Sequence, residues 1–130
     1  MIVKRAMKRG EDQELRWLDD LFAAIDGRNV DRFLAFLADD ARFRFGNMPP
    51  VHGKQAIGAA VGGFFDSIEA CRHEVSGSWR HPDSVICHGN VTYTRRDQKR
   101  VTVPFANVLI LRGELIRDYL IFVDISPLYA

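Results

Sequence analysis

The period of the hydrophobic pattern changes part-way along the chain, and this change limits the possible folds more than any other feature. Before residue 70, apolar residues recur at the three- and four-residue spacing of amphipathic helices, whereas from residue 71 they alternate with polar residues as in strands. The strands expected at 71–80, 84–96, 100–112 and 114–124 are joined by short connections, which allow only antiparallel pairing of neighbours. Helices followed by a meander of long strands predict an α+β fold.

Three helices are expected ahead of this sheet. The first covers 11–26 and ends at Gly27, and the third covers 53–68. Between them, Asn29 is a suitable cap for a short helix that continues to Asp39-Asp40. A short strand at 41–45 and a rigid Gly-Asn-Met-Pro-Pro loop at 46–50 complete the pattern. The chain thus predicts three N-terminal helices packed on a curved antiparallel sheet.

Composition indicates one globular domain, residues 1–130. Apolar residues make up 47% of the chain, charged residues 27%, and the formal net charge is +1. This balance provides no basic surface for nucleic acid or an anionic membrane, and no apolar run is long enough to span a bilayer. The chain contains only 2 cysteines, and free thiols are typical of a reducing, cytoplasmic compartment.

The expected pairing of the first two strands keeps the cysteines and histidines apart. A turn at 81–83 places Cys71 opposite Tyr93 and Cys87 opposite Gly77, too far apart for a disulfide. His73 and His88 point to opposite faces, and no HExxH or CxxC spacing predicts a metal site. Phosphate-binding and dinucleotide-binding motifs are also missing from the sequence, so we expect no cofactor.

The last two strands provide the candidate acid–base residue. A tight turn at Arg112-Gly113 pairs Asn107 with Asp118 on a face that also carries Phe105, Leu120 and Phe122. An apolar wall with two neighbouring polar groups is typical of a small-molecule site. Desolvation there would favour the protonated carboxyl that general acid–base catalysis needs. The alternative is structural, with Asp118 hydrogen-bonded to Asn107 or paired with an arginine.

Weaker candidates are Asn47, Trp17, Tyr93 and Arg95. Turn chemistry alone explains Asn47, core packing explains Trp17, and strands favour tyrosine. A three-residue loop after the second long strand would turn Tyr93 toward the helices, opposite Val103, with Arg95 near the rim; a two-residue loop would turn both outward.

The order of elements, with FRFGNMPPVHGKQAI after the second helix and GELIRDYLIFVDISPLYA at the end, resembles the nuclear transport factor 2-like superfamily. Within it the chain is most similar to SnoaL-like proteins, which include polyketide cyclases; limonene-epoxide hydrolases and ketosteroid isomerases are more distant. The resemblance implies a cone-shaped roll, a conical pocket between the helices and an antiparallel or mixed sheet, and a homodimer formed through the outer sheet face.

Short motifs also resemble limonene-epoxide hydrolase. Asn47 matches an asparagine that helps to hold the nucleophilic water, although Phe45 replaces its tyrosine partner. Arg95-Arg96-Asp97 is similar to the Arg-x-Asp of these enzymes. Arg117-Asp118-Tyr119 resembles their last strand, whose aspartate is catalytic, with a displacement of two residues.

Three functions remain open from the sequence. The first is a cofactor-free enzyme that moves a proton on, or adds water to, a small carbonyl or cyclic substrate through Asp118. The second is a binding module for an apolar metabolite, and the third is a dimeric interaction domain. The outer face expected to form the dimer carries Ala106, Val108, Ile110, Leu115, Tyr119 and Ile121.

Overall fold

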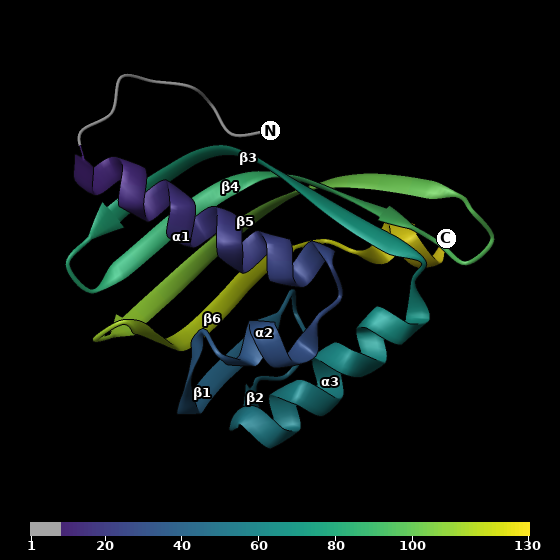
Figure 1. The fold of residues 1–130 in the computed structure, drawn as a ribbon. Coiled ribbons are helices and arrows are strands. Elements are labelled where there is room, and N and C mark those ends of the chain that lie inside the picture. Colours follow the sequence, from purple (N-terminus) through teal and green to yellow (C-terminus); the bar gives the residue numbers. More distant parts are fainter. Residues whose placement is uncertain (1–8) are drawn as a thin grey trace.

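The computed structural model describes residues 9–130, with side chains from Arg16 onward. This part contains three α-helices, six strands and a short C-terminal 3-10 helix (Figure 1). The helices are α1 (Arg9–Asp26), α2 (Val30–Leu34), α3 (Lys54–Ser67) and η1 (Ser126–Tyr129). The strands are β1 (Leu37–Phe45), β2 (Val51–His52), β3 (Ala70–His81), β4 (Ser84–Thr94), β5 (Arg100–Arg112) and β6 (Leu115–Val123).

The strands form one mixed sheet in the order β2-β1-β6-β5-β4-β3. Strand β1 runs parallel to β6, and every other neighbouring pair is antiparallel. Figure 1 shows α1 lying across one face of the long strands, with α2 and α3 beyond its C-terminal end. The predicted α+β roll of three helices on a curved sheet is confirmed. Within residues 9–130, no helix is long and apolar enough to cross a membrane.

The second helix is shorter than predicted and the strand after it begins earlier. Helix α2 ends at Leu34, and β1 already begins at Leu37. The backbone N–H of Ile116 donates to the carbonyl of Phe36 at 2.8 Å, which ties this segment to β6. Pairing with the sheet and burial of Leu37 therefore prevail over the local helical pattern.

The hairpin of β3 and β4 follows the predicted register from Ala70 to Val75. Cys71 pairs with Tyr93 and Val75 with Gly89, but a bulge then shifts the register so that Ser78, not Gly77, faces Cys87. At Gly89 the strands approach so closely that a Cβ would lie 1.9 Å from a backbone oxygen of β3. Both cysteines are buried and free.

The β4–β5 connection is longer than either predicted loop. It covers residues 95–99, so Tyr93 pairs with Val101 instead of Val103. The two-residue displacement preserves the face, because side chains alternate with a period of two. Tyr93 therefore faces the helices, as the three-residue loop predicted.

The β5–β6 register differs from the prediction, and the difference places the side chains of β6 from Asp118 onward on the opposite face of the sheet. The turn is at Gly113-Glu114, and a bulge between Ile116 and Asp118 adds one residue, so Asp118 pairs with Ile110 instead of Asn107. An odd displacement moves every later side chain of β6 to the other face. Tyr119 and Ile121 consequently face inward, and Asp118 faces outward with Leu120 and Phe122.

Candidate active site

A cavity of about 370 Å³ lies between the helices and the inner face of the sheet. Most of its wall is apolar, which suits a small organic molecule. Met48 and Tyr129, which are exposed, belong to the lining and mark the side where the cavity reaches the surface. The apolar lining includes Phe33, Phe43, Phe45, Val51, Val61, Phe64, Phe65, Val91, Phe105, Ile121 and Ile125.

The strongest polar feature of the wall is a pair formed by Asp26 and His73. Asp26 is the last residue of α1, and its Oδ1 lies 2.6 Å from Nδ1 of His73 on β3. The other carboxylate oxygen accepts the backbone N–H of His73 at 2.9 Å. Because a carboxylate only accepts, this contact places a proton on Nδ1 of His73. In the neutral form of the ring, Nε2 then carries the free lone pair.

Aromatic rings hold the imidazole in place. The rings of Phe22 and Phe105 lie 4.6 and 5.1 Å from the His73 ring, measured between centroids. His73 belongs to the cavity lining and its side chain is 11% exposed. An oriented imidazole with a carboxylate behind it and an apolar cavity in front is suited to general acid–base chemistry.

Cys71 completes a cluster of possible metal ligands. Its Sγ lies 3.7 Å from Oδ1 of Asp26 and 3.7 Å from the carbonyl of Ile25. Burial, followed by the nearby Asp26 charge, raises the pKa of the Cys71 thiol to about 12, so the thiol is protonated at neutral pH. Sulfur, imidazole and carboxylate are zinc donors. A metal here would have to displace the thiol proton and replace the hydrogen bond between Asp26 and His73.

Two buried phenols also line the cavity, Tyr93 and Tyr119. Burial raises the pKa of both, so each remains a neutral hydroxyl that can donate a hydrogen bond. Edge-on rings fix their positions, Phe64 against Tyr93 at 5.6 Å and Phe33 against Tyr119 at 5.4 Å. Tyr93 is thus placed as predicted, whereas Tyr119 reaches the cavity because of the bulge in β6.

Asn107 lies in the wall as predicted, but without its expected neighbour. It is 2% exposed and lines the cavity from β5, next to Phe105 in the inward-facing series. No residue of the described chain hydrogen-bonds its Oδ1.

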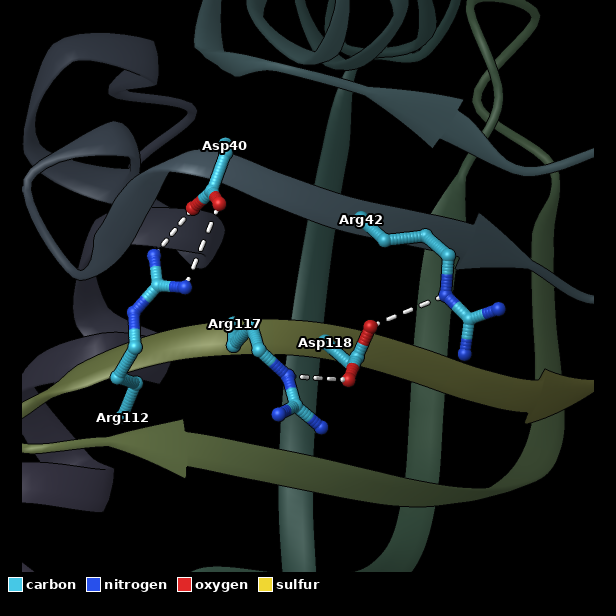
Figure 2. Close-up of polar contacts among 5 residues, drawn as sticks. All are labelled: Asp40, Arg42, Arg112, Arg117 and Asp118. Carbon is cyan, nitrogen blue, oxygen red and sulfur yellow. Dashed lines mark hydrogen bonds and ion pairs between the residues drawn. The ribbon is translucent and has the colours of Figure 1, made fainter.

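The structure contradicts the proposed position of Asp118. Its carboxyl pairs with Arg42 of β1 and with Arg117, each at 3.0 Å (Figure 2). Alternation along β6 puts Asp118 on the face opposite to that of Tyr119. A second pair, Asp40 with Arg112, lies beside it on the same side. The structural alternative with an arginine partner is therefore the one observed.

The prediction also placed Leu120 and Phe122 on the cavity face, whereas both lie with Asp118 on the outer face of β6. Phe122 is 57% exposed. The bulge in β6, which the sequence pattern does not mark, is the physical reason for all three errors. Phe105, on the unaffected strand β5, lines the cavity as predicted.

The remaining candidates lie outside the cavity lining. Asn47 is exposed in the loop between β1 and β2. Trp17 packs its ring edge-on against Phe36 at 5.9 Å, which favours the core-packing alternative. Arg95 donates to the carbonyl of Ala130 and pairs with Asp97, each at 3.0 Å, so its guanidinium is held at the C-terminus.

Comparisons with known proteins identify the domain. The family model of the SnoaL-like domain matches residues 18–119. The chain belongs to the SnoaL-like family. No curated protein matches the sequence significantly.

Solved structures agree on the fold. The SnoaL-like chain is similar to a nuclear transport factor 2-like protein of unknown function from Burkholderia pseudomallei, with 16% identity, a TM-score of 0.79, and 88% of this chain and 92% of that chain covered. A candidate SnoaL-like polyketide cyclase from a Jannaschia species has 16% identity and a TM-score of 0.78 over 97% and 95% of the chains. A candidate polyketide cyclase from Xanthomonas campestris has 14% identity and a TM-score of 0.80 over 90% and 94%.

Sequence reasoning did not find the Asp26–His73 pair of this SnoaL-like domain. The available signal was His73 itself, a histidine on the inward side of a strand between Cys71 and Val75, which are both buried. Its partner comes from the end of a helix 47 residues earlier, which alternation along a strand cannot indicate.

Proposed function

We propose that this SnoaL-like domain is a cofactor-free enzyme that performs acid–base chemistry, such as isomerisation, cyclisation or hydration, on a small, mostly apolar carbonyl or cyclic substrate. The observation that carries the proposal is His73, held by Asp26, in the wall of a mostly apolar cavity. His73 replaces Asp118 as the proposed acid–base group, because only His73 faces the cavity.

The chemistry follows from the state of each group. Nε2 of His73 takes a proton from the carbon next to the substrate carbonyl; the C–H electron pair becomes the C=C bond of an enolate, and negative charge moves to the oxygen. The Asp26 carboxylate stabilises the imidazolium that forms. The Tyr93 phenol donates to the enolate oxygen. The imidazolium then returns its proton to carbon or oxygen, which regenerates neutral His73.

A test needs only a simple ketone and deuterium oxide. Catalysed exchange of the α-protons of 1-tetralone, followed by NMR, reports proton abstraction next to a carbonyl. We expect exchange with the native protein, and a loss of about 10²–10⁴-fold in His73→Gln, which can still donate to Asp26 but lacks the base. His88→Gln is the matched control, since His88 stacks on Trp79 on the outer face. Equal exchange in both variants would contradict the proposal.

A non-catalytic binding module is the second candidate, favoured by the predominantly apolar lining of the cavity. Such a module would bind 1-tetralone with a similar affinity in the native protein and in His73→Gln. It would show no exchange in either, so the same experiment separates the two functions.

We also propose that the domain forms a homodimer through its outer sheet face and functions in the cytoplasm, where its two free thiols would stay reduced. The face differs from the predicted one, because the β6 bulge replaces Tyr119 and Ile121 with Leu120 and Phe122. Large apolar patches rarely face water on a monomer. Light scattering should show a dimer at micromolar concentration and a monomer for Phe122→Lys; a native monomer would contradict the proposal. Apolar side chains of this face include Trp79, Ile86, Ala106, Val108, Ile110, Leu115, Leu120 and Phe122.

A further inference from the structure

We propose that the substrate carries a second polar group, a hydroxyl or N–H that donates a hydrogen bond to Asn107. The substrate class is then an apolar ring compound that is polar at two ends, rather than a simple ketone. This inference rests on the proposed function only in assuming that the cavity holds a ligand.

The state of the Asn107 amide supports this inference. The side chain is 2% exposed, and its Oδ1 has no partner among residues 9–130. Buried polar groups are nearly always hydrogen-bonded, and leaving one unpaired costs the folded protein its desolvation free energy. The Oδ1 atom is an acceptor, so the missing partner is a donor.

The four side chains next to Asn107 in the sheet offer its Oδ1 no strong donor. Its inward-facing neighbours along β5 are Phe105 and Leu109, and the residues paired with it across the sheet are Cys87 and Ile121. Burial raises the pKa of the Cys87 thiol to about 12, and a thiol is a weak donor. A structural role would require a partner that these side chains do not provide, whereas the cavity on which Asn107 borders has room for a ligand group.

An apolar surface separates His73 from Asn107 along the wall. The ring of Phe105 lies 5.1 Å from the ring of His73, and Asn107 is the next inward-facing residue beyond Phe105 on β5. A molecule that reaches both must cover Phe105 with an apolar body. Its reacting carbonyl then lies beside His73 and its donor beside Asn107. A site built to hydrogen-bond a hydroxyl discriminates strongly against the analogue that lacks it.

Binding of four related ketones tests the inference by calorimetry. The probes are 1-tetralone, its 6-hydroxy and 7-hydroxy derivatives, and 6-fluoro-1-tetralone, in which fluorine fills the position without donating. We expect at least one hydroxy derivative to bind the native protein about tenfold more tightly than 1-tetralone and the fluoro compound. This preference should disappear in Asn107→Leu and in Asn107→Val. The second variant keeps the test usable if the first does not fold. Leu109→Val, on the same strand but outside the cavity lining, should keep it.

Melting temperatures of the unliganded variants show whether each one folds. A hydroxyl preference that survives in either folded variant, or no preference for either hydroxy derivative in the native protein, would overturn the inference. Failure of the proposed catalysis has a different signature: the hydroxyl preference would persist, also in His73→Gln, while α-proton exchange would be missing.

Discussion

Asp26→Asn is the substitution that tests the geometry of the candidate site most closely, because it keeps the shape of the side chain while it removes the negative charge and changes the hydrogen-bonding capacity. Asp26 accepts from Nδ1 and from the backbone N–H of His73, at 2.6 and 2.9 Å. An amide has one acceptor oxygen and one donor nitrogen, so it cannot accept both bonds. If its oxygen keeps the backbone N–H, its NH₂ faces Nδ1 and moves the imidazole proton to Nε2, where it points into the cavity.

The expected magnitudes follow from these contacts. Loss of one hydrogen bond to a charged group costs about 1.5–3 kcal/mol of the free energy of unfolding. For a domain of this size, this cost lowers the melting temperature by roughly 5–15 °C. Proton abstraction should fall by about 10²–10⁴-fold, since Nε2 becomes a donor and can no longer act as the base.

Two measurements decide the outcome. Long-range ¹H–¹⁵N NMR of the histidine rings should show the Nδ1–H tautomer of His73 in the native protein and the Nε2–H tautomer in Asp26→Asn. Exchange of the 1-tetralone α-protons should fall in parallel. Asp20→Asn, an exposed substitution on the same helix, is the control. A variant that exchanges protons at the native rate, with an unchanged tautomer, would refute the role assigned to Asp26.

Three further substitutions test other parts of the structure. Burial holds the pKa of the Cys87 thiol at about 12, against 9.0 for an ordinary thiol. The contribution of the neutral thiol to stability is therefore complete below pH 9 and is lost as the pH rises toward 12. Over this range, the free energy of unfolding should fall less steeply in Cys87→Ala than in the native protein. Asp118→Asn should leave α-proton exchange within about twofold of native and cost about 1–3 kcal/mol in chemical denaturation, because its side chain is only 13% exposed and pairs with two arginines; a hundredfold loss of exchange would instead return it to the active site. Gly89→Ala should lower the free energy of unfolding by at least about 1–3 kcal/mol in the same assay, because the added Cβ would lie 1.9 Å from the Glu74 carbonyl oxygen. An unchanged denaturation midpoint would show that the bulge relaxes freely.

The architecture was predictable because it depends on signals that extend over many residues. The change from helical to alternating periodicity located strands β3 to β6, and short connections required their antiparallel order. The face of Tyr93 was also predicted, since the error in the β4–β5 loop was an even number of residues. Such errors move a side chain along a strand without turning it over.

The site was less predictable, because it depends on single residues. One extra residue in β6 moved Asp118 out of the cavity and brought Tyr119 into it, and no glycine or proline marks that bulge in the sequence. The Asp26–His73 pair depends on how the end of α1 docks on β3, which is a tertiary contact. Alternation placed His73 on a face but could not identify its partner.

The central claim is that the substrate lies in the cavity with its carbonyl beside His73, and intermolecular NOEs to bound 1-tetralone test this placement directly. We predict NOEs from the α-methylene protons of the ketone to the ring protons of His73 and Phe105, whose rings lie 5.1 Å apart in the cavity wall. NOEs to the rings of Trp79 and Phe122 on the outer face, with none to His73, would contradict the account.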